Sequence, residues 1–312
     1  MDLFYLLDNV RKEYARSLII ATIIGAGIII PYAFVIADAL AAHEITSVVI
    51  IASVTPALDI VLIATFVIYN FRVVRKNRHN YRSHYKAYFI KPALAQTFTN
   101  LYYNHDMGIS KGLINLADAI NTGDRVTSND YVSGKYKDVG FTQADIKIEE
   151  KHRDLEGDTY YATIFKGRYM IFEFPKKFSF KLRITQKFFR GKKHGFLSNL
   201  DSKYTRISTE SGSFNQKFTV HAEDGFEAYY ILGPDLIDRI ETLSNNIKGK
   251  IMLAFTDNKL HVAIRNNKDA FEPPNPFVRI NKEIELYKVR QDIRAITDFV
   301  DQLKLNSKLF TN

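Results

Sequence analysis

Residues 17–40 read SLIIATIIGAGIIIPYAFVIADAL, and residues 45–71 read ITSVVIIASVTPALDIVLIATFVIYNF. These two stretches decide how the rest of the chain is arranged. Each is longer than the roughly 20 apolar residues that an α-helix needs to cross the hydrocarbon core of a membrane. Only residues 41–44 separate them, too few for a folded domain. The sequence therefore predicts a transmembrane helical hairpin within residues 1–71.

Positive charge indicates which way this hairpin faces. Arg11, Lys12 and Arg16 precede the first span, and the turn between the spans has no Lys or Arg. The second span is followed by six juxtamembrane basic residues: Arg72, Arg75, Lys76, Arg78, Arg82 and Lys86. Because Lys and Arg are enriched on the cytoplasmic side of transmembrane helices, both termini are predicted to be cytoplasmic.

Two other interpretations of the apolar stretches remain open. The first stretch could be a cleaved signal peptide, since Ala37-Asp38-Ala39 has the small-x-small form of a cleavage site. Its apolar run, however, exceeds the 7 to 15 residues usual in such peptides. The stretches could also be buried core helices of a soluble protein, but their length and flanking charge favour the membrane.

Asp59 is the intramembrane polar residue that needs an explanation, because a charged carboxylate near the centre of a span is costly. If the hairpin turns near residue 43, Asp59 faces Gly25, Ala26 and Gly27, where small residues allow close helix approach. A protonated carboxyl bonded to a backbone carbonyl or to Thr55 is one interpretation. A proton or ion relay, or a contact between subunits, is the other.

Composition excludes several kinds of site. The 312 residues are 46% hydrophobic and include no Cys, so disulfides, thiolate metal sites and cysteine nucleophiles are absent. The net charge of +9 is concentrated in two acid-free runs, one between Arg72 and Lys91 and one between Lys176 and Lys193. A partner of opposite charge should therefore bind at those runs.

Residues 72–122 are predicted to form a helical connector and residues 123–312 a cytoplasmic α+β domain. Strand-like alternation with interspersed helices predicts a mainly antiparallel sheet. We expect hairpin turns at Lys166-Gly167-Arg168 and at Asp257-Asn258. A closing helix over 281–305 carries apolar residues at steps of three and four, which indicates either core packing or a coiled coil.

The second basic run is predicted to be a loop that contacts lipid. Its eight cations are Lys176, Lys177, Lys181, Arg183, Lys187, Arg190, Lys192 and Lys193. The aromatic residues among them, Phe178, Phe180, Phe188 and Phe189, would enter the membrane interface, where each cation gains about 1 kcal/mol from anionic lipid. Single-stranded nucleic acid or a merely solvated loop are the alternatives, and nucleic acid is disfavoured.

The tightest group of titratable residues is His221, Glu223 and Asp224. These residues could form a metal or general-base site, but Asp224 with Glu227 also resembles a capping box that begins a helix. The other His residues lack metal-ligand spacing, and no phosphate-binding or nucleophile-elbow motif is present. The sequence predicts no catalytic residues, no metal and no cofactor.

Several runs of the sequence resemble a known family. They are KAYFIKPALAQTFTNLYYNHDMGIS (86–110), DYVSGKYKDVGFTQADIKI (130–148), IFKGRYMIFEFPKKF (164–178) and FNQKFTVHAEDGFEAYYILGPDLIDRI (214–240). Together they resemble the bacterial "domain of unknown function 3137" family. The resemblance implies two N-terminal spans followed by a cytoplasmic domain. It implies no reaction, ligand or catalytic residue.

These observations predict an inner-membrane, multi-pass protein whose cytoplasmic domain is a non-catalytic binding or scaffolding module docked on anionic lipid. Its expected partners are the membrane, an unidentified protein and a second copy of the chain. A membrane-anchored hydrolase or nuclease using the His221 region is one alternative function. A channel or transporter subunit built around Asp59 is another.

Overall fold

The computed structural model describes residues 2–42, 56–154, 157–189, 204–307 and 309–310. Within them the chain forms two compact units. The first comprises Met1–Ile90 and Glu272–Glu285, and the second comprises Lys91–Phe271 and Leu286–Asn312. The connector predicted at 72–122 is thus divided between the two units.

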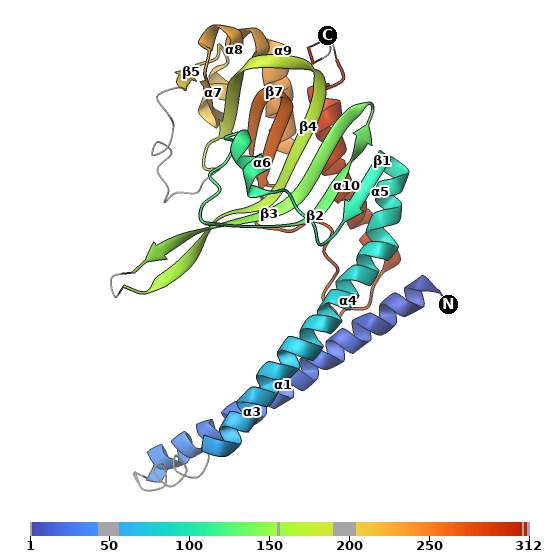
Figure 1. Ribbon diagram of the computed structural model, residues 1–312, viewed down its shortest axis with the longest axis vertical. Coiled ribbons are helices and arrows are strands. Elements are labelled where there is room, and N and C mark those ends of the chain that lie inside the picture. Colours follow the sequence, from blue (N-terminus) through green and yellow to red (C-terminus); the bar gives the residue numbers. More distant parts are fainter. Residues whose placement is uncertain (1, 43–55, 155–156, 190–203, 308, 311–312) are drawn as a thin grey trace. The chain divides into compact units, whose positions relative to one another are not determined.

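The first unit is helical (Figure 1). It contains α1 (Leu3–Ala42), α3 (Pro56–Tyr69), the π-helical turn η1 (Asn70–Val74), α4 (Arg75–Tyr85) and the π-helical turn η2 (Lys86–Ile90). From α3 to Ile90 the chain follows one helical path, and α1 runs antiparallel to it. Near the start of α1, the ring of Phe4 lies 5.6 Å from that of Tyr88, and further along Tyr14 lies 6.1 Å from Tyr81.

Helix α1 is longer than a membrane requires. Its 40 residues would extend about 60 Å at 1.5 Å per residue, twice the thickness of a hydrocarbon core. Asp2 caps the start of the helix, because its Oδ1 accepts a hydrogen bond from the Phe4 amide at 3.0 Å. Its first turns are amphipathic and bury Leu7 and Val10. Its predominantly apolar part begins at Ser17.

The second unit combines an antiparallel sheet with flanking helices, as predicted from the sequence (Figure 1). Its strands are β1 (Thr99–Asn104), β2 (Arg125–Tyr136), β3 (Val139–Arg153), β4 (Thr159–Gln186), β5 (Thr205–Ile207), β6 (Phe218–Ala222) and β7 (Lys250–Arg265). Its helices are α5 (Lys91–Thr97), α6 (Lys111–Leu116), α7 (Gly212–Lys217), α8 (Gly225–Ile231), α9 (Pro234–Asn246) and α10 (Lys282–Leu303). The described strands are ordered β1-β2-β3-β4-β6-β5, and β7 also pairs with β4.

Two predicted hairpins are wrong, because each is a single long strand. β4 runs without a turn through Gly167, and β7 runs without a turn through Asp257; the two strands pair antiparallel along most of their length. Gly167 serves a close approach of backbones rather than a turn: a Cβ there would lie 1.9 Å from the Ile264 carbonyl oxygen. The chain instead reverses between β3 and β4, where the Asp158 amide donates to Asp154 Oδ1 at 2.8 Å.

The two faces of the sheet have separate cores. One face packs Ile146 and Ile148 of β3 against the segment around α6, including Ile114. The opposite face packs against α10, where the rings of Phe172 and Phe299 lie 5.8 Å apart. The apolar stripe predicted on α10 is buried within its own unit at Val289, Ile293, Ile296, Val300 and Leu303, whereas Leu286 is exposed. Of the two predicted roles for this stripe, the structure shows core packing.

Candidate functional site

The apolar parts of α1 and α3 expose large aliphatic side chains. Ile29 of α1 and Ile60 of α3 are each 67% exposed. Over the described residues, one helix is long and apolar enough to cross a membrane: Leu3–Ile30 of α1, with a mean hydropathy of 1.6 in its best window. A signal sequence near the N-terminus would satisfy the same criterion. The described part of the second predicted span is α3, which has 14 residues.

The helices pack at a different level from the one predicted. A Cβ built at Gly25 would lie 3.4 Å from the ring of Phe66. Gly25 is therefore beside Phe66, about two turns of α3 beyond residue 59, and not beside Asp59 as predicted. Asp59 lies within α3, and its side chain is outside the described part of the structure.

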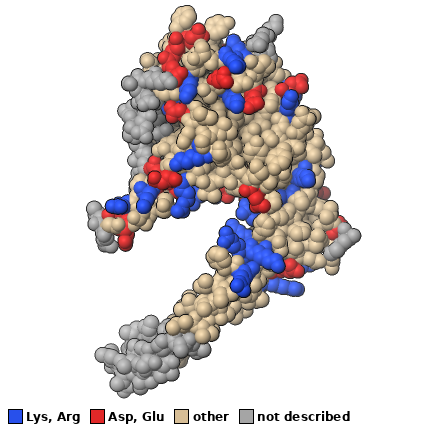
Figure 2. All heavy atoms as spheres, viewed as in Figure 1, with Lys and Arg blue, Asp and Glu red and all other residues tan. Residues whose placement is uncertain are grey.

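The six juxtamembrane basic residues fall into two groups. Arg72, Arg75, Lys76 and Arg78 are exposed, and Figure 2 shows Lys and Arg gathered beside the uncharged part of the first unit. The other two, Arg82 and Lys86, form ion pairs with Glu272. Lys86 is buried, with its Nζ 3.5 Å from Glu272 Oε1. The first group is thus open to solvent, and the second holds Glu272 against the helices.

The second basic run is not the loop that the sequence predicted. Residues 175–186 belong to β4, and Phe178, Phe180 and Phe189 are buried in the core. The apolar side chains alternate along the strand, so they point inward rather than toward a membrane. Of the aromatic residues proposed for the interface, Phe188 is exposed.

The cations of this run are also dispersed. Lys177 and Lys187 are exposed, and Lys176 and Lys181 are partly buried. Arg183 is buried: it pairs with Asp118 Oδ2 at 2.6 Å and lies over the ring of Tyr204. Arg190, Lys192 and Lys193 lie outside the described residues. Arg183 therefore belongs to the packing of the sheet domain and not to a lipid-facing surface.

The His221 region is occupied by structural contacts. His221 of β6 is buried opposite Arg183, and burial, followed by the charges of Arg183 and Arg206, lowers its pKa. Glu223 Oε2 accepts a hydrogen bond from the Lys181 amide at 2.9 Å.

Asp224 begins α8 as predicted, because its Oδ1 accepts hydrogen bonds from the Phe226 and Glu227 amides at 2.8 and 3.1 Å. The predicted helix-capping role of Asp224 is therefore confirmed.

A buried polar row crosses the sheet on the face covered by α10, and sequence reasoning missed it. Asp145 of β3 is paired in register with Arg168 of β4. Arg168 donates to the carbonyl oxygen and to Oδ1 of Asp292 in α10, at 2.6 and 2.5 Å. Asp130 of β2, at the other end of the row, accepts from the Tyr103 hydroxyl at 3.0 Å. The one indication of this row in the sequence is a charged residue, Asp145, within the alternating pattern of a strand.

Burial strongly perturbs the pKa of two groups in the sheet domain. Desolvation raises the pKa of Asp145 to about 8, and the charge of Arg168 only partly opposes this rise. On the other face of the sheet, His261 Nδ1 lies 3.0 Å from the hydroxyl of Tyr169. Burial lowers the pKa of His261 to about 4, so the imidazole is neutral at pH 7. Both groups are enclosed and reach no described surface.

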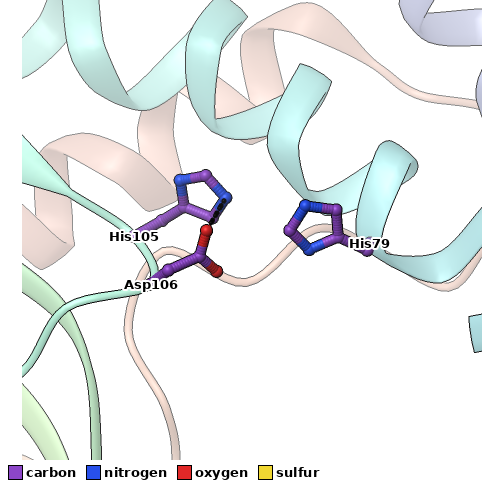
Figure 3. A group of neighbouring side chains, drawn as sticks. All are labelled: His79, His105 and Asp106. Atoms are coloured by element: carbon purple, nitrogen blue, oxygen red, sulfur yellow. Dashed lines mark ion pairs between the residues drawn. The ribbon is translucent and has the colours of Figure 1, made fainter. Parts of the chain in front are cut away.

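His105 and Asp106 form the polar pair drawn in Figure 3. His105 Nε2 lies 3.3 Å from Asp106 Oδ2, immediately after β1. His79, which is also drawn, belongs to the first unit. Two side chains within one unit are fewer than the three or four protein ligands typical of a zinc site. We therefore assign no metal to this pair.

Comparisons with known proteins identify a family for most of the sheet domain. A model described as "Protein of unknown function (DUF3137)" matches residues 163–305. No curated protein matches the chain. Among solved structures, that of the mycobacterial trehalose monomycolate transport factor A, TtfA, is similar, with 9% identity and a TM-score of 0.36, over 71% of this chain and 95% of that chain. A similarity this low supports no inference. This family model covers residues 163–305, from within β4 to just past α10, and supports the resemblance found in the sequence.

Proposed function

We propose that this chain is an integral protein of the bacterial inner membrane, anchored by a hairpin of α1 and α3 with both termini in the cytoplasm. The sheet domain then serves as a non-catalytic binding or scaffolding module held beside anionic lipid. The observation that carries this proposal is the exposed aliphatic surface of α1 and α3, where Ile29 and Ile60 are each two-thirds exposed. Apolar surface on this scale indicates a membrane or a protein partner.

The distribution of charge supports the lipid contact. Arg16 of α1 and the exposed group Arg72, Arg75, Lys76 and Arg78 are close to where the apolar parts of the two helices begin. Each cation at that level gains about 1 kcal/mol from the anionic cytoplasmic leaflet. The second basic run is not needed for this contact, because Arg183 and most of its aromatic residues are buried.

The test of the anchor is the double variant Ile29→Arg/Ile60→Arg in the full chain. An Arg near the centre of a span costs about 2.5 to 3.5 kcal/mol on insertion scales, so two of them should abolish stable insertion. We expect the unmodified chain to stay in the membrane pellet after an alkaline wash, and the double variant to leave it.

Leu3→Arg is the matched control. Leu3 is 66% exposed, like the two isoleucines, but it lies at the start of α1 outside the apolar stretch. This variant should stay in the membrane pellet to the same extent as the unmodified chain. If the unmodified chain is released by the wash, or if the double variant is retained, the proposed anchor is wrong.

A further inference from the structure

The segment Glu272–Asn281 is a loop of the first unit that lies against α1 and α4. Its start is held by the ion pairs of Glu272 with Arg82 and Lys86. Further along, the Tyr81 hydroxyl donates to the Pro274 carbonyl oxygen at 3.1 Å, and Arg11 donates to that of Pro276 at 2.6 Å. These contacts hold residues 272–276 along the helices beside Arg82, Tyr81 and Arg11.

The loop then reverses direction. The Val278 amide donates to the Asn275 carbonyl oxygen at 3.0 Å, and the Phe277 amide donates to Asn275 Oδ1 at 3.0 Å. Beyond this turn the chain leads back to the start of α1, because Lys282 Nζ lies 4.1 Å from the centroid of the Phe4 ring. Residues 274–276, held at Tyr81 and Arg11, therefore lie nearer the apolar parts of α1 and α3 than Lys282 does, and the turn at 275–278 overlaps this part of the loop.

Two adjacent apolar side chains are exposed at this tip. Phe277 is 56% exposed and Val278 is 57% exposed, and the exposed Arg279 follows them. Single exposed apolar residues are common in soluble proteins, but their position here is unusual. Arg11, which binds the loop at Pro276, precedes the apolar stretch at Ser17 by six residues, or about 9 Å of helix. This distance is slightly more than the roughly 5 to 8 Å of headgroup region on each side of the hydrocarbon core.

We infer that the tip of this loop inserts Phe277 and Val278 into the headgroup–acyl boundary of the anionic leaflet, as a contact additional to the helical hairpin. This inference rests on the proposed membrane anchor. The bilayer is the occupant that fits, because Arg11, which holds the loop at Pro276, lies about 9 Å of helix from the start of the apolar stretch, and Arg279 supplies the charge that anionic headgroups attract. Through Arg11 and Tyr81, the loop would fix the depth of the first unit in the membrane.

The test uses single-cysteine variants of the full chain, which has no Cys of its own. Phe277→Cys is labelled with a small environment-sensitive fluorophore and placed in nanodiscs of phosphatidylglycerol and phosphatidylcholine. Lipids that carry a quencher near the headgroup end of their acyl chains are then added. We expect the label at position 277 to lose most of its emission, and to lose less in nanodiscs of phosphatidylcholine alone.

Two matched sites distinguish failure of this inference from failure of the anchor. Tyr5→Cys replaces a side chain that is 59% exposed at the far end of α1, so its label should stay bright. Ile23→Cys, 64% exposed in the apolar part of α1, should be quenched if the hairpin is embedded. If the label at position 23 is quenched and the label at position 277 is not, the loop contact alone is wrong. A disulfide between two copies of the unlabelled Phe277→Cys variant would also overturn it, because the tip would then contact a second chain. No quenching at 23 overturns the anchor itself.

Discussion

Replacement of Gly167 by Ala is expected to lower the free energy of unfolding of the sheet domain by at least about 3 kcal/mol, through overpacking and lost strand hydrogen bonds. A Cβ at this position would lie 1.9 Å from the carbonyl oxygen of Ile264, and that oxygen belongs to backbone. No side-chain rotation can relieve the overlap. β4 and β7 would have to separate at the place where Gly167 pairs with Arg265. The φ of +155° at Gly167 adds backbone strain for any other residue.

Hydrogen exchange of the β4 and β7 amides in the full chain, followed by mass spectrometry, measures this effect where it arises. Gly112→Ala is the control, since a Cβ at Gly112 in α6 meets no atom within 4 Å. Ala is the better helix former, so this change should leave protection unchanged or slightly raised. Equal protection of β4 and β7 in the Gly167→Ala variant and the parent would contradict the close approach of the two strands.

A second large effect is expected in the pH dependence of stability, and Asp145 causes it. Burial raises the pKa of this carboxyl to about 8, against about 3.9 in an unfolded chain. Between these values the folded state binds a proton that the unfolded state lacks. Stability is therefore fully present at low pH and is lost as pH rises through about 8. Arg168, Asp130 and Asp269 are the charged groups that act on Asp145.

The contribution of Asp145 to the pH dependence of stability is best measured between pH 6.5 and 8. His261, whose pKa is lowered to about 4, has the opposite dependence, since its contribution is lost as pH falls from about 6.5 toward 4. Above pH 6.5 the imidazole is neutral in both states. Exchange protection of the β3 amides should fall as pH rises across this window, after correction for intrinsic exchange rates.

Asp145→Asn should remove most of this slope. An Asn side chain has nearly the same shape and can still accept the hydrogen bond that the Ala270 amide gives to Oδ2 at 2.5 Å. It carries no titrating proton. An identical slope in the variant and the parent would show that Asp145 is not the group responsible.

Hydropathy and periodicity were sufficient for the parts of the fold that depend on local pattern. The apolar residues of α10 repeat at three and four, so the helix and its buried face could be predicted from the sequence. The first apolar stretch likewise lies within the single long helix α1. The cap at Asp224 was predictable because it involves only residues two and three positions away.

The errors arose where a local signal competes with pairing between distant residues. Gly167 resembles a turn residue, yet the close approach of Ile264 explains it. The positive charge of residues 175–186 favoured the prediction of a lipid-contacting loop. The alternation of Phe178, Phe180 and Leu182, however, is that of a half-buried strand. The pairing of Asp145 with Arg168 could not be predicted without the register that the turn near Asp154 sets.

The central claim is that the chain crosses the membrane as a hairpin and leaves the sheet domain in the cytoplasm. Because the chain has no Cys, His43→Cys in the predicted turn and Lys137→Cys on the exposed β2–β3 turn can each be labelled selectively. A membrane-impermeant maleimide is applied to intact spheroplasts. The account predicts labelling at position 43 at once and at position 137 only after permeabilisation. Labelling at position 137 in intact spheroplasts would contradict the predicted orientation and, with it, the proposed role of the domain.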